Sequence, residues 1–301
     1  MSNSEMIRKR DAGEGRNLEH PPLPQPLPFE VYDNHTHLEF EDGIETLLPE
    51  ESLAKALQVG VRGVIQVGTD LATSRWGVEL AKTNPAVKAA IALHPNEAPR
   101  LAAKGDLEAH LEAISALAAS PEVCAIGETG LDFFRTGEEG RDSQYLSFEA
   151  HISIAKENNL ALQIHDRDAH AEVLEVLDRV GAPERTVLHC FSGDLEFAQQ
   201  CIERGFYLSF AGTVTFKNAH GLREALGSAP LAQILVETDA PFLTPEPFRG
   251  RPNAPYLMPH TVRAMAAFLQ ADLDALCRQL ASNTEAVYGS WPTTQRPEGA
   301  S

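Results

Sequence analysis

Cysteine is scarce in this sequence, which has 301 residues and only four cysteines. The four are scattered and form no C-x-x-C pair, so the pattern suggests neither a zinc ribbon nor a disulfide framework. Long apolar runs are also absent, and none approaches the roughly 20 residues that a membrane-spanning helix needs. The first twenty residues lack the apolar stretch of a secretory signal. These absences predict a reduced, cytoplasmic protein without a membrane partner.

Basic residues are in the minority. The chain has 25 Lys and Arg against 43 Asp and Glu, which gives a formal net charge of −18. Because contacts with phosphates need Lys and Arg, this balance argues against a protein that coats nucleic acid nonspecifically. It does not exclude a local basic pocket, or a bound cation that meets a phosphate.

Both ends of the chain differ in composition from the middle. Residues 1–28 mix charges of both signs and end in PPLPQPLP, and residues 290–301 are polar with Pro and Gly. We predict a disordered, Pro-rich tail over 1–28 and a flexible tail over 290–301. The remaining span, 29–289, is predicted to be one folded domain.

Between the tails, short apolar runs alternate with amphipathic stretches. The predicted strands cover 29–35, 61–69, 87–95, 122–130, 160–166, 185–191, 205–210 and 233–239. The predicted helices cover 51–60, 73–84, 106–119, 143–159, 169–180, 195–205, 222–228, 258–270 and 273–282. Eight alternating units over about 260 residues favour an α/β fold of the (β/α)8 TIM-barrel type. The alternative is a doubly wound open sheet, although no G-x-G-x-x-G follows a strand.

Titratable side chains fall where the predicted strands end. The segment DNHTHLE places His35 and His37 at i and i+2, which puts two imidazoles on one face of a strand. Five later predicted strands also end in such groups. Four of them end at His94, Glu128, His165 and His189, and the last ends at Glu237 and Asp239. Active sites of (β/α)8 barrels lie at the carboxyl ends of the strands, so these groups are expected to converge.

The expected ligand set contains imidazoles and carboxylates, which suit Mg, Mn or Zn. Its six members are His35, His37, Glu128, His165, His189 and Asp239. One catalytic metal needs about three or four ligands, so six favour two divalent ions. Glu128 has two carboxylate oxygens and could bridge the ions, and Asp239 could act as a general base.

Seven motifs, in order, closely resemble the TatD family of metal-dependent deoxyribonucleases in the amidohydrolase superfamily. They are DNHTHLE, ALHP, GETGLDFFR, IHDRDAH, HCFSG, ETDAPFL and RGRPNAP, and the resemblance runs from about Tyr32 to Tyr288. It implies a (β/α)8 hydrolase that acts as a 3′–5′ exonuclease on single-stranded DNA or RNA. It also implies the same six metal ligands, with His94 and Arg135 near the substrate phosphate. Phe133 and Phe134 replace tyrosines in the family pattern, so this loop lacks their two hydroxyl groups.

Some interpretations stay open at this point. Arg167 could bind a substrate phosphate, or it could pair with Asp166 or Asp168. The barrel could instead hydrolyse a small ester, an amide, a phosphotriester or a charged-tRNA ester, because one fold hosts many chemistries. A metal-binding protein without catalysis is a third class, but a structural site is normally closed with four ligands.

Overall fold

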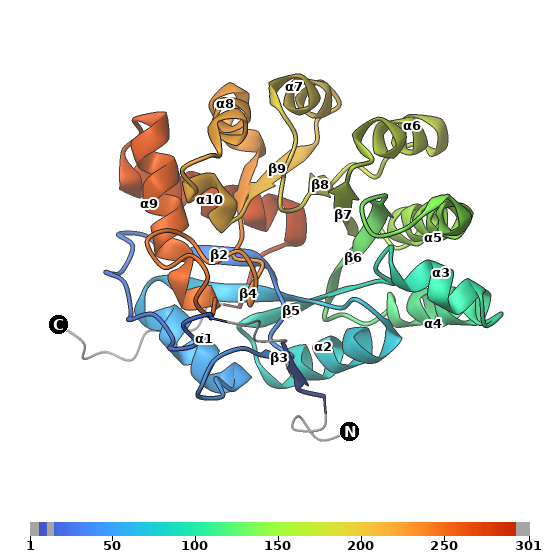
Figure 1. Cartoon of the computed structure of the whole chain (residues 1–301), viewed down its shortest axis with the longest axis horizontal. Helices are drawn as coiled ribbons and strands as arrows, with labels where there is room; N and C mark the ends of the chain where they lie inside the picture. Colours follow the sequence, from blue (N-terminus) through green and yellow to red (C-terminus); the bar gives the residue numbers. More distant parts are fainter. Residues whose placement is uncertain (1–5, 11–14, 293–301) are drawn as a thin grey trace.

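The computed structural model describes residues 6–10 and 15–292, and it contains one sheet of eight parallel strands. Its strands are β2 (Val31–Thr36), β4 (Val61–Val67), β5 (Val87–Ile91), β6 (Val123–Asp132), β7 (Ala161–Arg167), β8 (Thr186–Leu188), β9 (Tyr207–Phe210) and β10 (Ile234–Val236). Neighbours in the sheet follow the chain order. Each of the eight predicted strands is present, and the predicted (β/α)8 barrel is confirmed (Figure 1).

Helices surround the strands, and all nine predicted helices are present. The observed bounds are α1 (Pro49–Gln58), α2 (Leu71–Thr83), α3 (Glu97–Ala102), α4 (Leu107–Leu117), α5 (Glu138–Glu157), α6 (His170–Val180), α7 (Leu195–Glu203), α8 (His220–Ser228), α9 (Met258–Leu269) and α10 (Leu273–Tyr288). Short 3-10 helices cover Gly212–Thr215, Leu231–Gln233 and Pro255–Leu257. The sequence did not predict α3, which has only six residues and too little length for a clear period.

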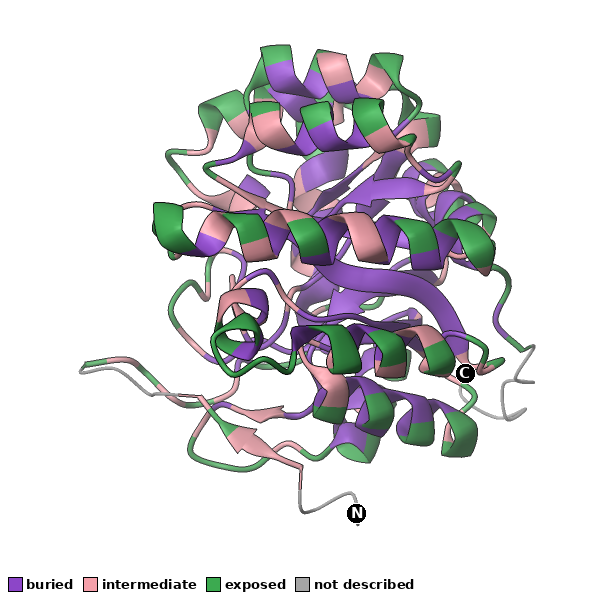
Figure 2. Cartoon of the chain, turned by 90° about the vertical axis from the view of Figure 1, so that its right-hand side faces the viewer, coloured by how far each residue is buried: buried purple, intermediate pink, exposed green. Residues whose placement is uncertain are grey.

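The hydrophobic core lies between the sheet and the inner faces of the helices. In Figure 2 the strands of the barrel are mostly buried, whereas the helices are buried on one side and exposed on the other. Strands covered on both faces read as continuous apolar runs, which is why the sequence revealed them. No helix in the described ranges is long and apolar enough to cross a membrane.

The barrel closes between β2 and β10 without a continuous ladder. Within the described residues, one isolated parallel bridge joins Thr36 to Ala240. Two backbone hydrogen bonds flank it, from Asp239 N to His35 O (2.9 Å) and from His37 N to Ala240 O (2.8 Å). The seam is therefore held at the carboxyl ends of the two strands, where the predicted ligands lie.

The prediction of a disordered tail does not hold for the described part of residues 1–28. There, β1 (Arg8–Lys9) pairs in parallel with β3 (Phe40–Glu41). Leu27 is buried, and its backbone N donates a hydrogen bond to Val59 O at 2.9 Å. The physical reason is that this segment finds hydrogen-bond partners and apolar surface on the barrel, which local composition does not reveal. Residues 1–5 and 11–14 of the predicted tail lie outside the described residues.

The folded part also extends past the predicted boundary at residue 289. The Trp291 side chain is buried and stacks on Tyr32, with ring centroids 4.3 Å apart. Lys88 Nζ lies 4.4 Å from the centroid of the same indole. The flexible tail predicted from residue 290 therefore begins too early, and residues 293–301 lie outside the described part of the chain.

Candidate metal centre

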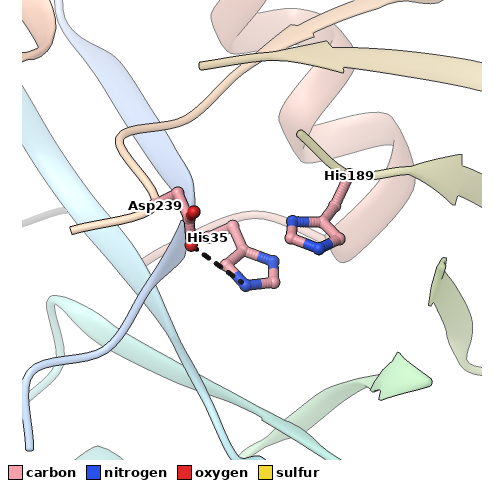
Figure 3. A group of neighbouring side chains, drawn as sticks. All are labelled: His35, His189 and Asp239. Atoms are coloured by element: carbon pink, nitrogen blue, oxygen red, sulfur yellow. Dashed lines mark ion pairs between the residues drawn. The ribbon is translucent and has the colours of Figure 1, made fainter. Parts of the chain in front are cut away.

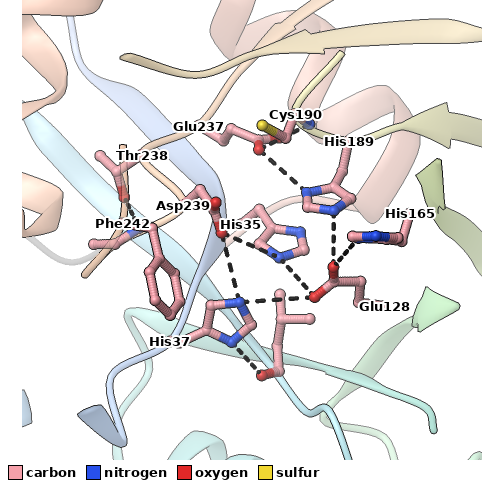
Figure 4. Close-up of polar contacts among 12 residues, drawn as sticks. His35, His37, Glu128, His165, His189, Cys190, Glu237, Thr238, Asp239 and Phe242 are labelled. Carbon is pink, nitrogen blue, oxygen red and sulfur yellow. Dashed lines mark hydrogen bonds and ion pairs between the residues drawn. The ribbon is translucent and has the colours of Figure 1, made fainter. Parts of the chain in front are cut away.

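The predicted ligands come together at the carboxyl ends of the strands. Figure 4 shows side chains that point toward one another from the ends of β2, β6, β7, β8 and β10: His35, His37, Glu128, His165, His189 and Asp239. Gly130 lets the β6 segment that carries Glu128 approach β7 closely. It has φ +140°, and a Cβ there would collide with the carbonyl oxygen of His165. A side chain at this position would therefore force the two ligand-bearing strands apart.

One group surrounds the Oε2 atom of Glu128. His35 Nε2 and His37 Nε2 lie 3.7 and 3.8 Å from this oxygen. The same two nitrogens lie 3.9 and 3.6 Å from Asp239 Oδ1. Ligands about 2.1 Å from a tetrahedral ion are separated by roughly 3.4 Å, so these spacings are close to those of a coordination sphere.

A second group surrounds the other oxygen of the same carboxylate. Glu128 Oε1 lies 2.6 Å from His165 Nδ1, 3.0 Å from His189 Nε2 and 3.4 Å from His94 Nε2. His94 was expected to contact substrate, and the structure brings it into this group with Glu128 and His165. The two oxygens of Glu128 therefore face different sets of imidazoles.

His35 fits a metal ligand better than a structural histidine. Its side chain is fully buried, and neither Nδ1 nor Nε2 has a hydrogen-bond partner. Figure 3 shows its ring between Asp239 and His189, and it stacks on His189 at a centroid distance of 3.9 Å. A buried imidazole without partners is costly, and coordination of a cation by Nε2 would offset that cost.

Two of the histidines are oriented by acceptors that lie next to Nδ1, on the side of the ring opposite Nε2. His37 Nδ1 lies 3.0 Å from Val67 O, which can only accept a hydrogen bond, so Nδ1 carries the proton. His189 Nδ1 lies 3.3 Å from Glu237 Oε1. Such partners leave Nε2 free to coordinate a cation and fix the ring orientation.

Glu237 was noted at the end of a strand but was not predicted to orient His189. Its side chain is fully buried, where it accepts hydrogen bonds from Cys190 N at 2.9 Å and Ser209 Oγ at 2.5 Å. In the sequence it stands only as the acidic residue two positions before Asp239 in ETD. Its contacts come from β8 and β9, which no local motif links to it.

Asp132 contacts the predicted ligand His165. Its Oδ2 lies 3.4 Å from His165 Nε2 and accepts a hydrogen bond from Asn96 Nδ2 at 2.9 Å. Burial alone would raise the pKa of Asp132, but hydrogen bonds from His165 and Asn96 lower it overall. The carboxylate is therefore anionic and can hold the His165 ring in place.

The centre favours an ionised Glu128. Burial raises the pKa of this carboxyl, but the charges of His94 and His189 and the hydrogen bonds from His165 and His189 bring it well below its usual range. An anionic carboxylate with one oxygen toward each group of imidazoles suits a bridge between two cations.

Of the two arginines expected near the substrate, Arg135 follows β6 and Arg167 is the last residue of β7. The Arg135 side chain is exposed, and its backbone N donates to Asp132 Oδ1 at 2.8 Å. The Arg167 guanidinium lies over the Phe134 ring, 3.9 Å from its centroid. Phe134 is 62% exposed, so it does not pack under its loop. Among the described residues, no ion pair joins Arg167 to Asp166 or Asp168, the alternative that the sequence left open.

The fold and this centre define a class, the metal-dependent hydrolases of the amidohydrolase type. Residues 32–289 match the family described as TatD related DNase. An uncharacterized metal-dependent hydrolase, TatD, of Mycobacterium tuberculosis is 40% identical over 265 residues, which cover 86% of this chain and 98% of the relative. A 3′–5′ ssDNA/RNA exonuclease, TatD, of Citrobacter rodentium is 35% identical over 246 residues, covering 80% and 91%.

The solved structures agree. The crystal structure of YjjV, a TatD homologue from Escherichia coli, has a TM-score of 0.77 at 27% identity and covers 86% of this chain and 98% of that one. The chain therefore belongs to the TatD family, and it is a metal-dependent hydrolase that acts on ester bonds. The resemblance noted in the sequence is confirmed.

Proposed function

We propose that this hydrolase is a 3′–5′ exonuclease that removes nucleotides from single-stranded ends of DNA or RNA with two divalent ions. The observation that carries the proposal is the division of the ligands between the two oxygens of Glu128. The first ion would take His35, His37, Glu128 and Asp239. The second would take Glu128, His165 and His189. The ions are Mg, Mn or Zn, since these ligands accept all three.

The residues have separate roles in the proposed reaction. Divalent ions held by these side chains would activate water and neutralise charge that builds up on the phosphate. Asp239 reaches the mouth of the centre, with 14% of its side chain exposed, and accepts a proton from the attacking water. The water oxygen bonds to phosphorus, and the bond from phosphorus to the 3′ oxygen of the preceding nucleotide breaks. That oxygen takes a proton from solvent water and becomes the new 3′ hydroxyl. Phosphate is oriented by His94 and Arg135.

A nucleic-acid substrate also fits the rim beside the metal centre. Phe134 lies two residues after Asp132, and Arg167 lies two residues after His165. Asp132 and Arg167 are paired in register between β6 and β7, so the two segments lie side by side. An exposed aromatic ring next to a guanidinium can stack a nucleobase and contact its phosphate. The relative named as an ssDNA/RNA exonuclease supports the same substrate class. A cytoplasmic location stays a prediction from the sequence.

The test is digestion of single-stranded and duplex DNA and single-stranded RNA, labelled in turn at each end. Each substrate is incubated with purified protein and Mg, Mn, Zn or EDTA. We expect mononucleotides released from the 3′ end of single strands, only with metal. The matched control is Glu128→Gln, which keeps the shape of the side chain and removes its charge.

Two results would contradict the proposal. Release that persists in EDTA or in Glu128→Gln would show that the proposed centre does not carry the activity. A folded protein that binds metal but cleaves no nucleic acid would indicate a smaller ester substrate. A panel of phosphodiester, carboxylester and charged-tRNA substrates would then identify the class.

A further inference from the structure

Among the described residues, no backbone hydrogen bond joins the segments that follow β2 and β10 beyond the one from His37 N to Ala240 O. Below the bridge, buried side chains join the strands, because Asp33 accepts a hydrogen bond from Thr238 N at 2.9 Å and Asn34 donates to Val236 O at 2.6 Å. Above it, one strand continues toward Asp42 and the other toward Pro241. His37 follows β2 and Asp239 follows β10, so these two ligands of the first proposed ion lie on opposite sides of the seam.

Arg10 connects the two sides. Its Nη1 atom donates to Pro241 O at 2.6 Å and to Asp42 Oδ2 at 3.0 Å. The Asp42 side chain is only 2% exposed, so its charge needs a cation beside it. The backbone of Arg10 is held as well, since its N donates to Glu41 O at 2.9 Å.

The same guanidinium reaches the ligands through an aromatic ring. Its carbon lies 4.7 Å from the centroid of Phe242, which packs edge-on against the His37 ring at 6.2 Å. Figure 4 shows the Phe242 ring beside His37. Phe242 N donates to Asp239 O at 2.8 Å, so the residue contacts both a ligand ring and a ligand backbone. Arg10 is thus one side chain removed from both His37 and Asp239.

The segment that carries Arg10 is fastened along the same seam. We call residues 6–10 and 15–28 the N-terminal strap. Arg16 in the strap binds Asp42 through two contacts of 3.1 and 2.7 Å and donates to Gly250 O at 2.9 Å. In return, Arg251 donates to the backbone oxygens of Glu19 and His20 at 3.0 and 3.1 Å. In Figure 1 the short strand β1 of the strap lies beside β3, which follows His35 and His37 along the chain.

The strap lies outside the family match, which begins at residue 32. We propose that it is an added clamp over the seam, and that Arg10 is a positioning residue that sets the separation of His37 and Asp239. The inference rests on the ligand set of the proposed function. A guanidinium suits this role because its planar fork can bond two acceptors while its face lies on an aromatic ring. A lysine ammonium offers no such face.

The experiment compares full-length Arg10→Ala and Arg10→Lys with wild type. Lys9→Ala is the matched control, because it removes the same charge from the exposed neighbour on β1. Mn²⁺ binding is titrated by calorimetry, and thermal unfolding is measured in EDTA. Residues that orient metal ligands commonly change metal affinity by about 10–100-fold. We therefore expect Arg10→Ala to weaken one of the two Mn²⁺-binding steps by about 10-fold. Lys9→Ala should bind as wild type does.

The outcomes separate a positioning role from a merely structural one. Partial recovery of Mn²⁺ affinity in Arg10→Lys, or on addition of guanidinium to folded Arg10→Ala, supports the clamp. If Arg10→Ala does not fold, the Arg10→Lys titration decides alone, and wild-type affinity there overturns the proposal. Wild-type Mn²⁺ affinity in a folded Arg10→Ala overturns it too. A wild-type protein that binds no Mn²⁺ would instead contradict the ligand set of the proposed function.

Discussion

Glu237 lies behind His189, with its Oε1 atom 3.3 Å from His189 Nδ1, and the opposite ring nitrogen lies 3.0 Å from Glu128. This line of carboxylate, imidazole and carboxylate leads from the buried interior to the centre. Replacing Glu237 by Gln removes the charge behind the ring and should weaken metal binding by about 10–100-fold. Calorimetric titration with Mn²⁺ measures the change.

A control for Glu237→Gln exists at the opposite end of the barrel. Glu285 accepts a hydrogen bond from Tyr32 Oη at 2.6 Å, away from the metal centre. Glu285→Gln should leave Mn²⁺ affinity unchanged. Equal affinities in the two variants would show that the charge on Glu237 does not act on the centre.

Metal binding should stabilise the fold. A ligand that binds only the native state adds about 2.7 kcal/mol at 100 times its Kd. Urea unfolding of the wild type should therefore shift to higher urea when Mn²⁺ replaces EDTA. Asp239→Asn keeps the side-chain shape but removes one ligand charge, and its shift should be smaller. A wild-type midpoint that does not respond to metal would contradict binding at this centre.

Phe134 should matter for long substrates and not for small ones. Base stacking on an aromatic side chain is worth about 1–3 kcal/mol per base, so Phe134→Ala should raise KM for single-stranded DNA by roughly 5–150-fold. Hydrolysis of bis(p-nitrophenyl) phosphate should change little. Phe268, which is 42% exposed on α9, provides the control Phe268→Ala. Equal losses on both substrates would point to damage at the metal centre instead of a lost stacking surface.

Trp291 should contribute strongly to stability, although it lies in the polar segment with Pro and Gly that was predicted to be a flexible tail. Its indole is buried against Tyr32. Removing a buried Trp or Phe side chain typically costs about 3–5 kcal/mol, so Trp291→Ala should lower the free energy of unfolding by at least about 2 kcal/mol. Urea unfolding monitored by circular dichroism tests this. An unchanged midpoint would mean that the stack with Tyr32 contributes nothing.

The sequence predicted the barrel and the ligands because both leave local signals. Parallel strands covered on two faces are nearly continuous apolar runs, and the fold places every strand end at one rim. His35, His165 and His189 could therefore be assigned to one centre before any contact was known. Family resemblance and strand-end position selected the same six residues.

The strap and the orienting residues left no such signal. Arg10 contacts Pro241 across 231 positions of sequence, and a two-residue strand such as β1 has no period to detect. Glu237 differs from an ordinary acidic residue only through its burial and its contacts with Ser209 and Cys190. Long-range polar contacts depend on how loops pack, which composition does not determine.

The central claim is that Glu128 bridges two divalent ions. Electron paramagnetic resonance of the protein loaded with Mn²⁺ tests it most directly, because only ions held a few ångströms apart by a shared ligand show exchange coupling. We predict a coupled spectrum at two Mn²⁺ per chain in the wild type, and its loss in Glu128→Gln. A wild-type spectrum of isolated Mn²⁺ ions at full loading would contradict the bridged centre.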